Sequence, residues 1–417
     1  MIPITILEEI TRDQEEKFRQ RDRGITRDID FEKYLKTAQI VVISGTRRCG
    51  KSTLLRQFYD NFGSCHYLNF DDERLLDFEV GDFQNLMLAF GKINDSKTIL
   101  LDEIQNIGSW ERFARRIYDE GYKIFITGSN AKLLSSELAT HLTGRYFGLE
   151  LSPFSFNEFL NLKKIDWKIL NSRKRIEILS AFDAYLQNGG FPEFLKSQDM
   201  EYLKKIYEDI LYKDIIARFG IREVKSFREL ANCVFSNFTQ ETSYNGLKNA
   251  LGFKSLVTVK NYVHYLQESY LAFEVFKYDF SLKKQYISNK KIFVIDNGLR
   301  NSVAFGFSED RGRLLENLVF LELKRRGKEI YYFKDKKECD FLVKKKNKII
   351  GAIQVAWRMD KNNQARELEG LWGAMEKFDL KEGIILTKDQ EDENNERGKV
   401  KIIPVWKWLL AAEWKNF

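Results

Sequence analysis

Five short apolar runs in the first part of the chain have the pattern of buried parallel strands, because they are continuous rather than alternating. They occupy residues 39–44, 65–70, 98–101, 123–127 and 145–151. A charged helical segment at residues 6–36 precedes the first run. Further helical segments separate the runs, at residues 51–61, 82–91, 109–120 and 131–139. Strands that alternate with helices predict an α/β layer sandwich with a parallel sheet.

The hydrophobic pattern changes after Pro153. Residues 154–278 have mainly helical periodicity, with one clear break at residues 188–194. Two helical segments and an apolar run follow one another at 243–278, which is the order of a winged-helix unit. From about residue 286, strands and helices alternate again. We therefore predict three parts, namely residues 1–160, 161–285 and 286–417.

The third part has the pattern of a second α/β domain. Its predicted strands are residues 291–296, 329–333, 338–344, 348–357, 383–387 and 401–406. Its predicted helices are residues 313–327 and 363–378. The acidic run at residues 389–396 is predicted to be a solvated loop.

Composition narrows the function only a little. The 417 residues include 68 Lys and Arg and 61 Asp and Glu, so the net charge is +7. A mildly basic balance permits a nucleic-acid partner without requiring one. Four dispersed cysteines and only three histidines argue against a zinc cluster or a disulfide framework. Free thiols and the lack of a long apolar stretch predict a cytoplasmic protein with no membrane span.

Residues 45–52, GTRRCGKS, match the phosphate-binding pattern G-x-x-x-x-G-K-[ST], with a buried strand before them and a helix after them. Two glycines let the loop wrap closely on phosphate oxygens, and backbone N–H groups at the helix start face the anion. Lys51 is expected to reach the β- and γ-phosphates and Ser52 to bind Mg²⁺. The predicted phosphate-site residues are Gly45, Thr46, Arg47, Arg48, Cys49, Gly50, Lys51, Ser52 and Thr53.

Polar side chains follow two other predicted strands. Asp102 and Glu103 end the strand at 98–101, where open α/β sheets bind ligands. Asp102 is expected to hold Mg²⁺ and Glu103 to polarise the attacking water; the alternative is a pair of acids that cap the next helix. Ser129 or Asn130, after the strand at 123–127, is expected to orient the water or to cap a helix. No N-K-x-D guanine-reading element follows, which favours ATP over GTP.

An arginine can stabilise charge on the transferred phosphoryl group. Arg145 is preferred for this role because it opens the last predicted strand, and a surface arginine is the alternative. The other candidates are Arg47, Arg48, Arg218 and Arg222. Arg47 and Arg48 could instead face a neighbouring subunit, so a homo-oligomer is left open.

These segments resemble the AAA-type predicted P-loop ATPases of archaea and bacteria. The resemblance rests on GTRRCGKST, TILLDEIQNIGSWERFARRIYDEG, KIFITGSNAKLL, LTGRYFGLELSPFSFNEF, NGGFPEF, DNGLR and RLLENLVFLELKRRG. It implies a RecA-like core with an additional strand, a catalytic Glu103, and ATP hydrolysis. It further implies a winged-helix part and a C-terminal domain of restriction-endonuclease-like fold.

A nuclease of that fold needs a helix Glu, a strand Asp, and [Glu/Gln]-x-Lys on the next strand, to bind Mg²⁺ and activate water. Glu316, Asp340 and Gln354 fall in this order, but Ala356 stands at the lysine position. A degenerate domain that grips a nucleic-acid backbone or a protein partner is therefore favoured over one that cleaves. Four nearby lysines, which could contact phosphate or form a solvated loop tip, are Lys344, Lys345, Lys346 and Lys348.

The second helix of the predicted winged-helix unit brings few cations to a groove. Its polar candidates are Lys254, Thr258, Lys260, Asn261 and His264. Two lysines favour a lid or adaptor over a DNA-reading helix. Three functions stay open: a Mg²⁺-dependent ATPase that acts on DNA or RNA, a nucleotide-gated switch that binds a protein partner, and an ATP-coupled nuclease.

Overall fold

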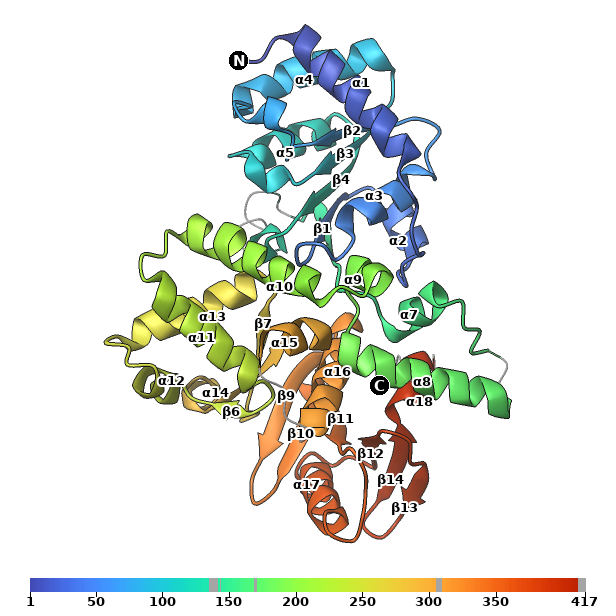
Figure 1. Ribbon diagram of the computed structural model, residues 1–417, viewed down its shortest axis with the longest axis vertical. Coiled ribbons are helices and arrows are strands. Elements are labelled where there is room, and N and C mark those ends of the chain that lie inside the picture. Colours follow the sequence, from blue (N-terminus) through green and yellow to red (C-terminus); the bar gives the residue numbers. More distant parts are fainter. Residues whose placement is uncertain (135–141, 143, 169–170, 305–309, 412–417) are drawn as a thin grey trace. The chain divides into compact units, whose positions relative to one another are not determined.

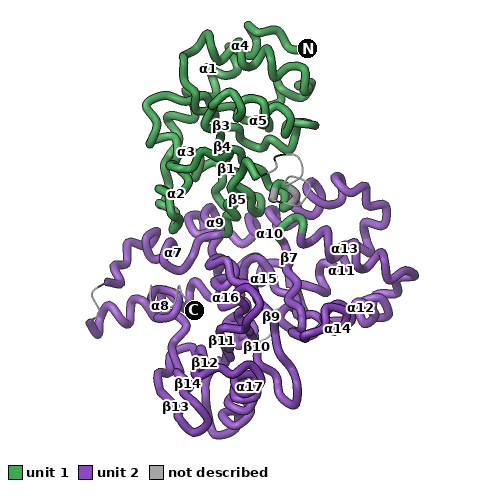
Figure 2. The backbone as a smooth tube through the Cα atoms, turned by 180° about the vertical axis from the view of Figure 1, so that it is seen from behind, with its two compact units in different colours: residues 1–152, 268–270 green, residues 153–267, 271–417 purple. Residues whose placement is uncertain are grey.

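The computed structural model describes the chain except for residues 135–141, 143, 169–170, 305–309 and 412–417. The chain forms two compact units (Figure 2). The first comprises residues 1–152 and 268–270, and the second comprises residues 153–267 and 271–417. Across the described residues, no helix combines the length and the apolar composition that crossing a bilayer requires.

The first unit is built on a five-stranded parallel sheet, as the apolar runs predicted. Its strands are β1 (Ile40–Ser44), β2 (His66–Asn69), β3 (Thr98–Asp102), β4 (Lys123–Gly128) and β5 (Tyr146–Glu150). Their order in the sheet is β2-β3-β4-β1-β5, and all neighbours run parallel. β1 lies inside the sheet, with the phosphate-binding loop following its carboxyl end.

Helices cover both faces of this sheet, which explains why the strand sequences are apolar at successive positions. The helices are α1 (Ile4–Gln20), α2 (Phe31–Lys36), α3 (Lys51–Tyr59), α4 (Phe83–Ile93) and α5 (Trp110–Asp119). In β1, Ile40 and Val42 join one buried cluster, whereas Val41 and Ile43 join another that includes Phe58 of α3. Of the helix predicted at 131–139, a 3₁₀ turn over Ala131–Leu134 is described and the rest lies outside the described residues.

The second unit begins with helices. They are α7 (Phe156–Leu162), α8 (Ser172–Asn188), α9 (Pro192–Ser197), α10 (Met200–Asp209) and α11 (Val224–Ser236), with a π-helix (Ile210–Ala217) after α10. The predicted break falls between α8 and α9. Gly189 has a φ of 68°, and a Cβ there would lie 2.1 Å from Oδ1 of Asp296, so both conformation and space require glycine.

A small antiparallel sheet follows these helices. It contains β6 (Glu241–Thr242), β7 (Ala272–Phe276) and β8 (Lys290–Val294) in the order β6-β8-β7. Helices α12 (Tyr244–Ala250) and α13 (Leu256–Glu268) connect β6 to β7, and α14 (Leu282–Ile287) precedes β8. The hydrophobic pattern assigned β8 to the third part of the chain, but β8 pairs with β6 and β7. The pattern could not show this, because it reveals a buried strand without revealing its partners.

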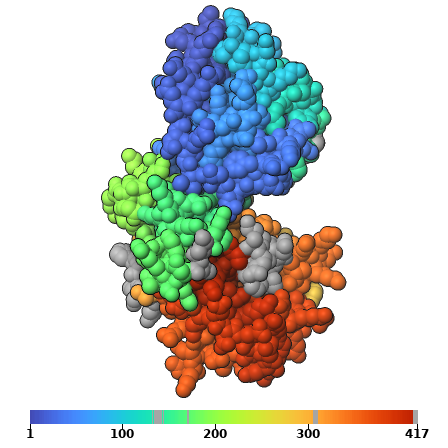
Figure 3. Space-filling model, turned by 90° about the vertical axis from the view of Figure 1, so that its right-hand side faces the viewer, coloured from blue at the N-terminus to red at the C-terminus, as the bar shows by residue number. Residues whose placement is uncertain are grey.

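The remaining residues form a six-stranded mixed sheet with its helices, and the surface of this part of the chain is orange and red in Figure 3. Its strands are β9 (Glu329–Lys334), β10 (Glu338–Lys345), β11 (Lys348–Val355), β12 (Glu382–Thr387), β13 (Asp392–Asn394) and β14 (Lys399–Pro404). Their order is β13-β14-β12-β11-β10-β9 (Figure 1). The associated helices are α15 (Asn297–Val303), α16 (Arg311–Arg325), α17 (Gln364–Lys377) and α18 (Val405–Leu410).

The acidic run at residues 389–396 is not a loop throughout, and that prediction was wrong for its centre. Asp392–Asn394 form β13, which pairs antiparallel with β14 at the edge of the sheet. Its two acids are exposed, so the strand buries no apolar side chain that the sequence could have revealed.

Candidate nucleotide site

The loop between β1 and α3 requires glycine at both ends. Gly45 has a φ of 155° and Gly50 a φ of 101°, both in the range that side chains disfavour. A Cβ on Gly45 would also lie 2.1 Å from the carbonyl oxygen of Leu151. The loop therefore passes close to β5 before it turns into the N-terminus of α3.

Lys51 points its ammonium into this loop. The side chain is 4% exposed, and Nζ donates to the carbonyl oxygens of Gly45 at 3.2 Å and Thr46 at 3.1 Å. Nζ also lies 3.7 Å from Oε1 of Glu103. The cation predicted to bind phosphate and the acid predicted to activate water thus lie in one site.

Asp102 is fully buried at the end of β3. It accepts hydrogen bonds from the hydroxyl of Tyr67 at 3.0 Å, from that of Thr127, and from the side chain of Ser52. Burial, together with the negative charge of Glu103, raises the pKa of Asp102. The contact with Ser52 brings together the two side chains predicted to bind Mg²⁺.

Glu103 has a left-handed φ of 54°, a conformation that is uncommon for residues other than glycine. Its backbone N–H donates to Thr127, and its carboxylate accepts from Gln105 at 2.6 Å and from Ser129 at 3.4 Å. Burial acts to raise the pKa of Glu103, but the charge of Lys51 and these hydrogen bonds outweigh it and hold the pKa below its ordinary value. Glu103 is thus set up to stay ionised beside its buried neighbour.

Of the two candidates after β4, Ser129 contacts Glu103 directly. Asn130 is buried beside it, and its backbone carbonyl accepts from the N–H of Leu133 at the first turn of the 3₁₀ helix. Both residues therefore lie at the carboxyl edge of the sheet. The geometry favours Ser129 as the partner of Glu103, and a role for Asn130 in orienting water stays a prediction.

Arg145 lies at the opposite end of the sheet from the phosphate-binding loop. β5 runs parallel to β1 with Tyr146 beside Ile40, so Arg145 is level with the start of β1. Its Nε lies 3.2 Å from Oδ1 of Asp119. From this position Arg145 cannot serve the loop of its own subunit, which corrects the preference drawn from the sequence. A role toward a neighbouring subunit stays a prediction.

The other arginine candidates differ in position. Arg47 is half-buried, and its charge acts to lower the pKa of Glu103. Arg48 is exposed in the loop, with a φ of 66°. Arg218 and Arg222 are exposed residues of the second unit. Arg47 is therefore the candidate that the structure brings to the acids.

Sequence reasoning missed three residues that hold the site together. Arg27 is buried and donates to the carbonyl oxygens of Cys49 at 2.9 Å and Ser152 at 2.6 Å. Tyr67 contacts Asp102, and the hydroxyls of Tyr270 and Ser44 share a hydrogen bond of 2.6 Å. These residues lie far from the loop in sequence and carry no motif, so no local signal could have identified them.

The donor set fits a nucleotide with Mg²⁺. The hydroxyl of Thr46 is buried in the loop with no hydrogen-bond partner among the described residues. The ammonium of Lys51 and the N-terminus of α3 supply positive charge, as phosphate requires. A hydroxyl and a carboxylate, from Ser52 and Asp102, are oxygen ligands of the kind Mg²⁺ prefers. Cys49 is buried, and burial raises the pKa of its thiol, so it acts as a packing residue.

Two relatives match almost the whole length of the chain. An uncharacterized protein of Methanocaldococcus jannaschii has a sequence identity of 36% to this chain. The match covers 97% of this chain and 95% of that protein. An uncharacterized protein of Haemophilus influenzae has a sequence identity of 32%, and this match covers 89% of this chain and 94% of that protein. Residues 37–160 match an AAA domain. The chain belongs to this family of AAA-domain proteins. In this AAA-domain protein, residues 179–311 and 311–408 match two domains of unknown function, DUF8612 and DUF4143.

Two solved structures are similar to parts of this AAA-domain protein at low TM-scores. AMPPCP-bound DnaA from Aquifex aeolicus is 17% identical over 57% of this chain and 85% of its own, with a TM-score of 0.26. PCH-2 of C. elegans is 12% identical over 46% of this chain and 59% of its own, with a TM-score of 0.27. At such scores the ligands of those proteins are not carried over to this one.

The three residues predicted for a nuclease site also come together, in the second unit. Glu316 lies on α16, Asp340 on β10 and Gln354 on β11. Nζ of Lys291 lies 2.8 Å from Oε1 of Glu316 and 3.1 Å from Oδ1 of Asp340. Oε1 of Gln354 accepts from the backbone N–H of Asp340 at 3.2 Å. Glu316, Asp340 and Gln354, which the sequence places in the order of a nuclease motif, therefore belong to one cluster. This cluster also contains Lys291, which comes from β8.

The predicted basic surfaces are exposed. On α13, Lys260, Asn261 and His264 are exposed and Thr258 is half-buried, and Lys254 is exposed just before the helix. At the turn between β10 and β11, Lys345, Lys346 and Lys348 are exposed, whereas Lys344 pairs with Glu329 at 2.7 Å. Both surfaces are accessible to a partner.

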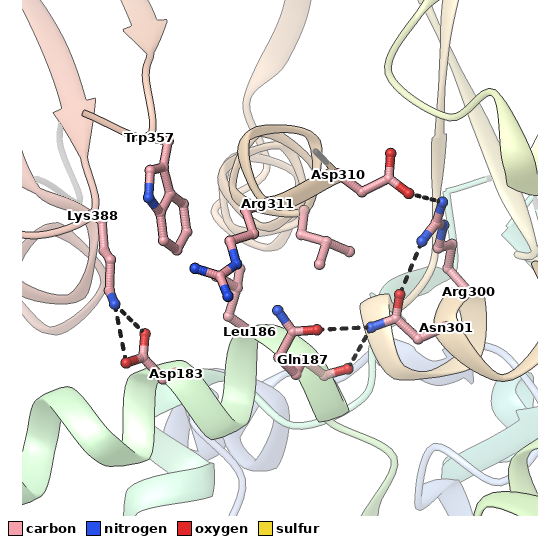
Figure 4. A pocket seen from close by; sticks show the side chains of 10 residues that line it. Asp183, Leu186, Gln187, Arg300, Asn301, Asp310, Arg311, Trp357 and Lys388 are labelled. Atoms are coloured by element: carbon pink, nitrogen blue, oxygen red, sulfur yellow. Dashed lines mark hydrogen bonds and ion pairs between the residues drawn. The ribbon is translucent and has the colours of Figure 1, made fainter. Parts of the chain in front are cut away.

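The second unit also contains a cavity of about 540 Å³ between α8, α15 and α16. Two ion pairs line it (Figure 4): Arg300 with Asp310, and Lys388 with Asp183 at 2.9 Å. The ammonium of Lys388 also lies 5.1 Å from the ring centroid of Trp357. None of the residues predicted for nucleotide binding lines this cavity.

Proposed function

We propose that this protein is a Mg²⁺-dependent ATPase. The observation that carries the proposal is the convergence of Lys51, Ser52, Asp102 and Glu103 at the carboxyl edge of one parallel sheet. The backbone N–H groups of the loop and the ammonium of Lys51 would bind the phosphates and balance their charge. The hydrogen bonds that Lys51 makes to Gly45 and Thr46 hold its ammonium at the mouth of the loop.

Ser52 and Asp102 would hold Mg²⁺, which when bound neutralises charge on the β- and γ-phosphate oxygens. Tyr67 and Thr127 fix the Asp102 carboxylate in place by hydrogen bonds. Since the pKa of Asp102 is raised by burial, a nearby cation would favour its ionised form. Asp102 therefore acts in binding rather than in proton transfer.

Glu103 would accept the proton of the attacking water. Its lowered pKa keeps it in the ionised form that a base requires. Gln105 and Ser129 orient the carboxylate at Oε2, leaving Oε1 toward Lys51. Glu103 and Asp102 thus divide two tasks between neighbouring carboxylates.

We favour a function in which ATP hydrolysis is coupled to the binding of a nucleic acid. The order α11, β6, α12, α13, β7, α14, β8 and the sheet order β6-β8-β7 resemble those of a winged-helix unit, with α14 as an additional helix between β7 and β8. The exposed polar face of α13 and the exposed lysines after β10 could contact phosphates. The net charge of +7 supports the same class of partner. A nucleotide-gated switch on a protein partner is the second candidate, supported by the small number of cations on α13.

A steady-state ATPase assay with Mg²⁺ tests the proposed ATP hydrolysis and its proposed coupling to nucleic acid. The assay is run in the presence and absence of single-stranded DNA, double-stranded DNA and RNA. Hydrolysis that requires Mg²⁺ and Glu103 supports the ATPase. Stimulation by nucleic acid that declines with salt supports the coupling. Hydrolysis that nucleic acid leaves unchanged favours the protein switch, and no hydrolysis under any condition contradicts the proposal.

The four free cysteines suit a reducing compartment, so we place the protein in the cytoplasm.

A further inference from the structure

The ammonium of Lys291 lies at the centre of a cluster of acids in the second unit. Nζ is 2.6 Å from Oε1 of Glu338, 2.8 Å from Oε1 of Glu316 and 3.1 Å from Oδ1 of Asp340. The lysine side chain is 4% exposed. Distances of this size are those of charge-assisted hydrogen bonds, so all three donor protons of the ammonium have an acidic partner.

These acids come from separate elements that the fold brings to one point. Glu316 lies on α16, whereas Glu338 and Asp340 lie on β10. A β-bulge interrupts the pairing of β10 with β9 between Cys339 and Leu342, which is where Asp340 leaves the regular register. Lys291 reaches the cluster from β8, a strand of the other sheet.

Polar atoms of Asp340 and Gln354 are engaged in further hydrogen bonds. Oδ2 of Asp340 accepts from the backbone N–H of Val355 at 2.9 Å. The amide of Gln354 accepts from the N–H of Asp340 with Oε1 and donates to Oε2 of Glu367 at 2.6 Å with Nε2. Few oxygens are left to coordinate a cation.

We infer that Lys291 takes the place of the catalytic Mg²⁺ of restriction-endonuclease-like sites, so that the C-terminal domain of this protein binds no metal there and cleaves no strand. Mg²⁺ would need the same oxygens at about 2.0–2.1 Å. Nζ of Lys291 lies 2.6–3.1 Å from one oxygen of each acid and so occupies the place between these oxygens that such an ion would take. The acids therefore hold β8 against α16 and β10 instead of holding a metal.

The same geometry predicts that removing the ammonium creates a site for a divalent cation. Lys291→Met keeps the length of the side chain but leaves three carboxylates facing one another. Mn²⁺ is a suitable probe, because it accepts carboxylate ligands and its free form is quantified by electron paramagnetic resonance. Lys290→Met is the matched control, since Lys290 is equally buried but donates to the carbonyl oxygens of Tyr286 and Ser288.

The experiment uses the full-length protein without nucleotide. We expect Lys291→Met to bind one more Mn²⁺ than the wild type, and the double variant Lys291→Met/Asp340→Asn to lose it. Lys290→Met and the wild type should bind equally. Folded Lys291→Met that gains no Mn²⁺ would overturn the inference.

A second measurement does not depend on Lys291→Met being folded. The wild type and Asp340→Asn are compared for bound Mn²⁺ and for nicking of plasmid DNA in Mg²⁺ or Mn²⁺. Equal Mn²⁺ binding and intact plasmid support the inference. Mn²⁺ that Asp340→Asn removes, or nicking that it abolishes, would overturn it and make Lys291 part of a working nuclease site. Neither result bears on ATP hydrolysis, so this proposal and the ATPase proposal fail separately.

Discussion

Nζ of Lys51 lies 3.7 Å from Oε1 of Glu103, although the two residues belong to different elements. Lys51 begins α3, and Glu103 directly follows β3. The cation and the acid thus hold each other at the edge of the sheet where phosphate and water would meet. Variants of each residue separate binding from hydrolysis.

Lys51→Ala should weaken the binding of Mg·ATP. The ammonium makes charge-assisted contacts to phosphate worth about 1.5–3 kcal/mol, so we expect an increase in Kd of about 10-fold to 100-fold. Isothermal titration calorimetry measures this Kd. Lys36→Ala, on an exposed lysine that pairs with Glu32, is the control and should bind as the wild type does. Equal affinity of Lys51→Ala and Lys36→Ala would exclude Lys51 from the phosphate site.

Glu103→Gln should bind ATP but hydrolyse it slowly. The amide keeps the shape and loses the basic oxygen, so turnover should fall by about 10²–10⁴-fold with little change in Kd. Single-turnover hydrolysis and a binding titration measure the two effects. Glu120→Gln, on an exposed acid paired with Arg116, should leave both unchanged. Near-normal turnover in Glu103→Gln would contradict the assignment of Glu103 as the base.

Gly45→Ala should damage the phosphate-binding loop. Its Cβ would lie 2.1 Å from the backbone carbonyl of Leu151 at a φ of 155°, and backbone cannot yield as a flexible side chain can. We expect the loss of nucleotide binding and a fall in stability of about 1–3 kcal/mol, measured by calorimetry and urea unfolding. Gly63→Ala is the control, because nothing lies within 4 Å of a Cβ there. A Gly45→Ala protein that still binds Mg·ATP would contradict the loop geometry.

Asp296 should make the stability of the second unit depend on pH. Burial raises its pKa from 3.8 to about 6. The folded state therefore keeps the proton to a higher pH than the unfolded state does. The stability from this group is present below about pH 4 and is lost as the pH rises to about 6, a change of about 3 kcal/mol.

Urea unfolding at a series of pH values, for the wild type and Asp296→Asn, measures this effect. Asp296 accepts hydrogen bonds from the N–H groups of Gly190 and Leu299, so the substitution also carries a cost at every pH. The informative quantity is therefore the difference between the two proteins as the pH changes. A difference that stays constant from about pH 4 to about pH 7 would show that Asp296 does not titrate in this range.

Much of the first unit could be predicted from the sequence because its signals are local. Continuous apolar runs identify strands that are covered on both faces, and β1 sends Val42 and Val41 into different clusters. The phosphate-binding loop and the pair Asp102–Glu103 follow strands directly, so their positions fix their place in the sheet. The place of Arg145 could not be fixed in the same way, because it precedes its strand and lies level with the start of β1.

The contacts that depend on distant parts of the chain could not be predicted. Arg27, Tyr67 and Tyr270 reach the site through tertiary packing, which no periodicity records. Lys291 is an intermediate case. Lysine is rarely buried in a strand, so its place beside the apolar run IFVI was a signal of a buried partner. The identity of that partner required the fold.

The hydrogen bond between Ser44 and Tyr270 places a late part of the chain next to the residue that precedes Gly45. Residues 268–270 belong to the first unit, whereas the chain on either side of them belongs to the second. Tyr270 is thus followed, with one residue between, by the first residue of β7. This one hydrogen bond therefore fastens a three-residue segment from a later part of the chain to the strand that leads into the phosphate-binding loop.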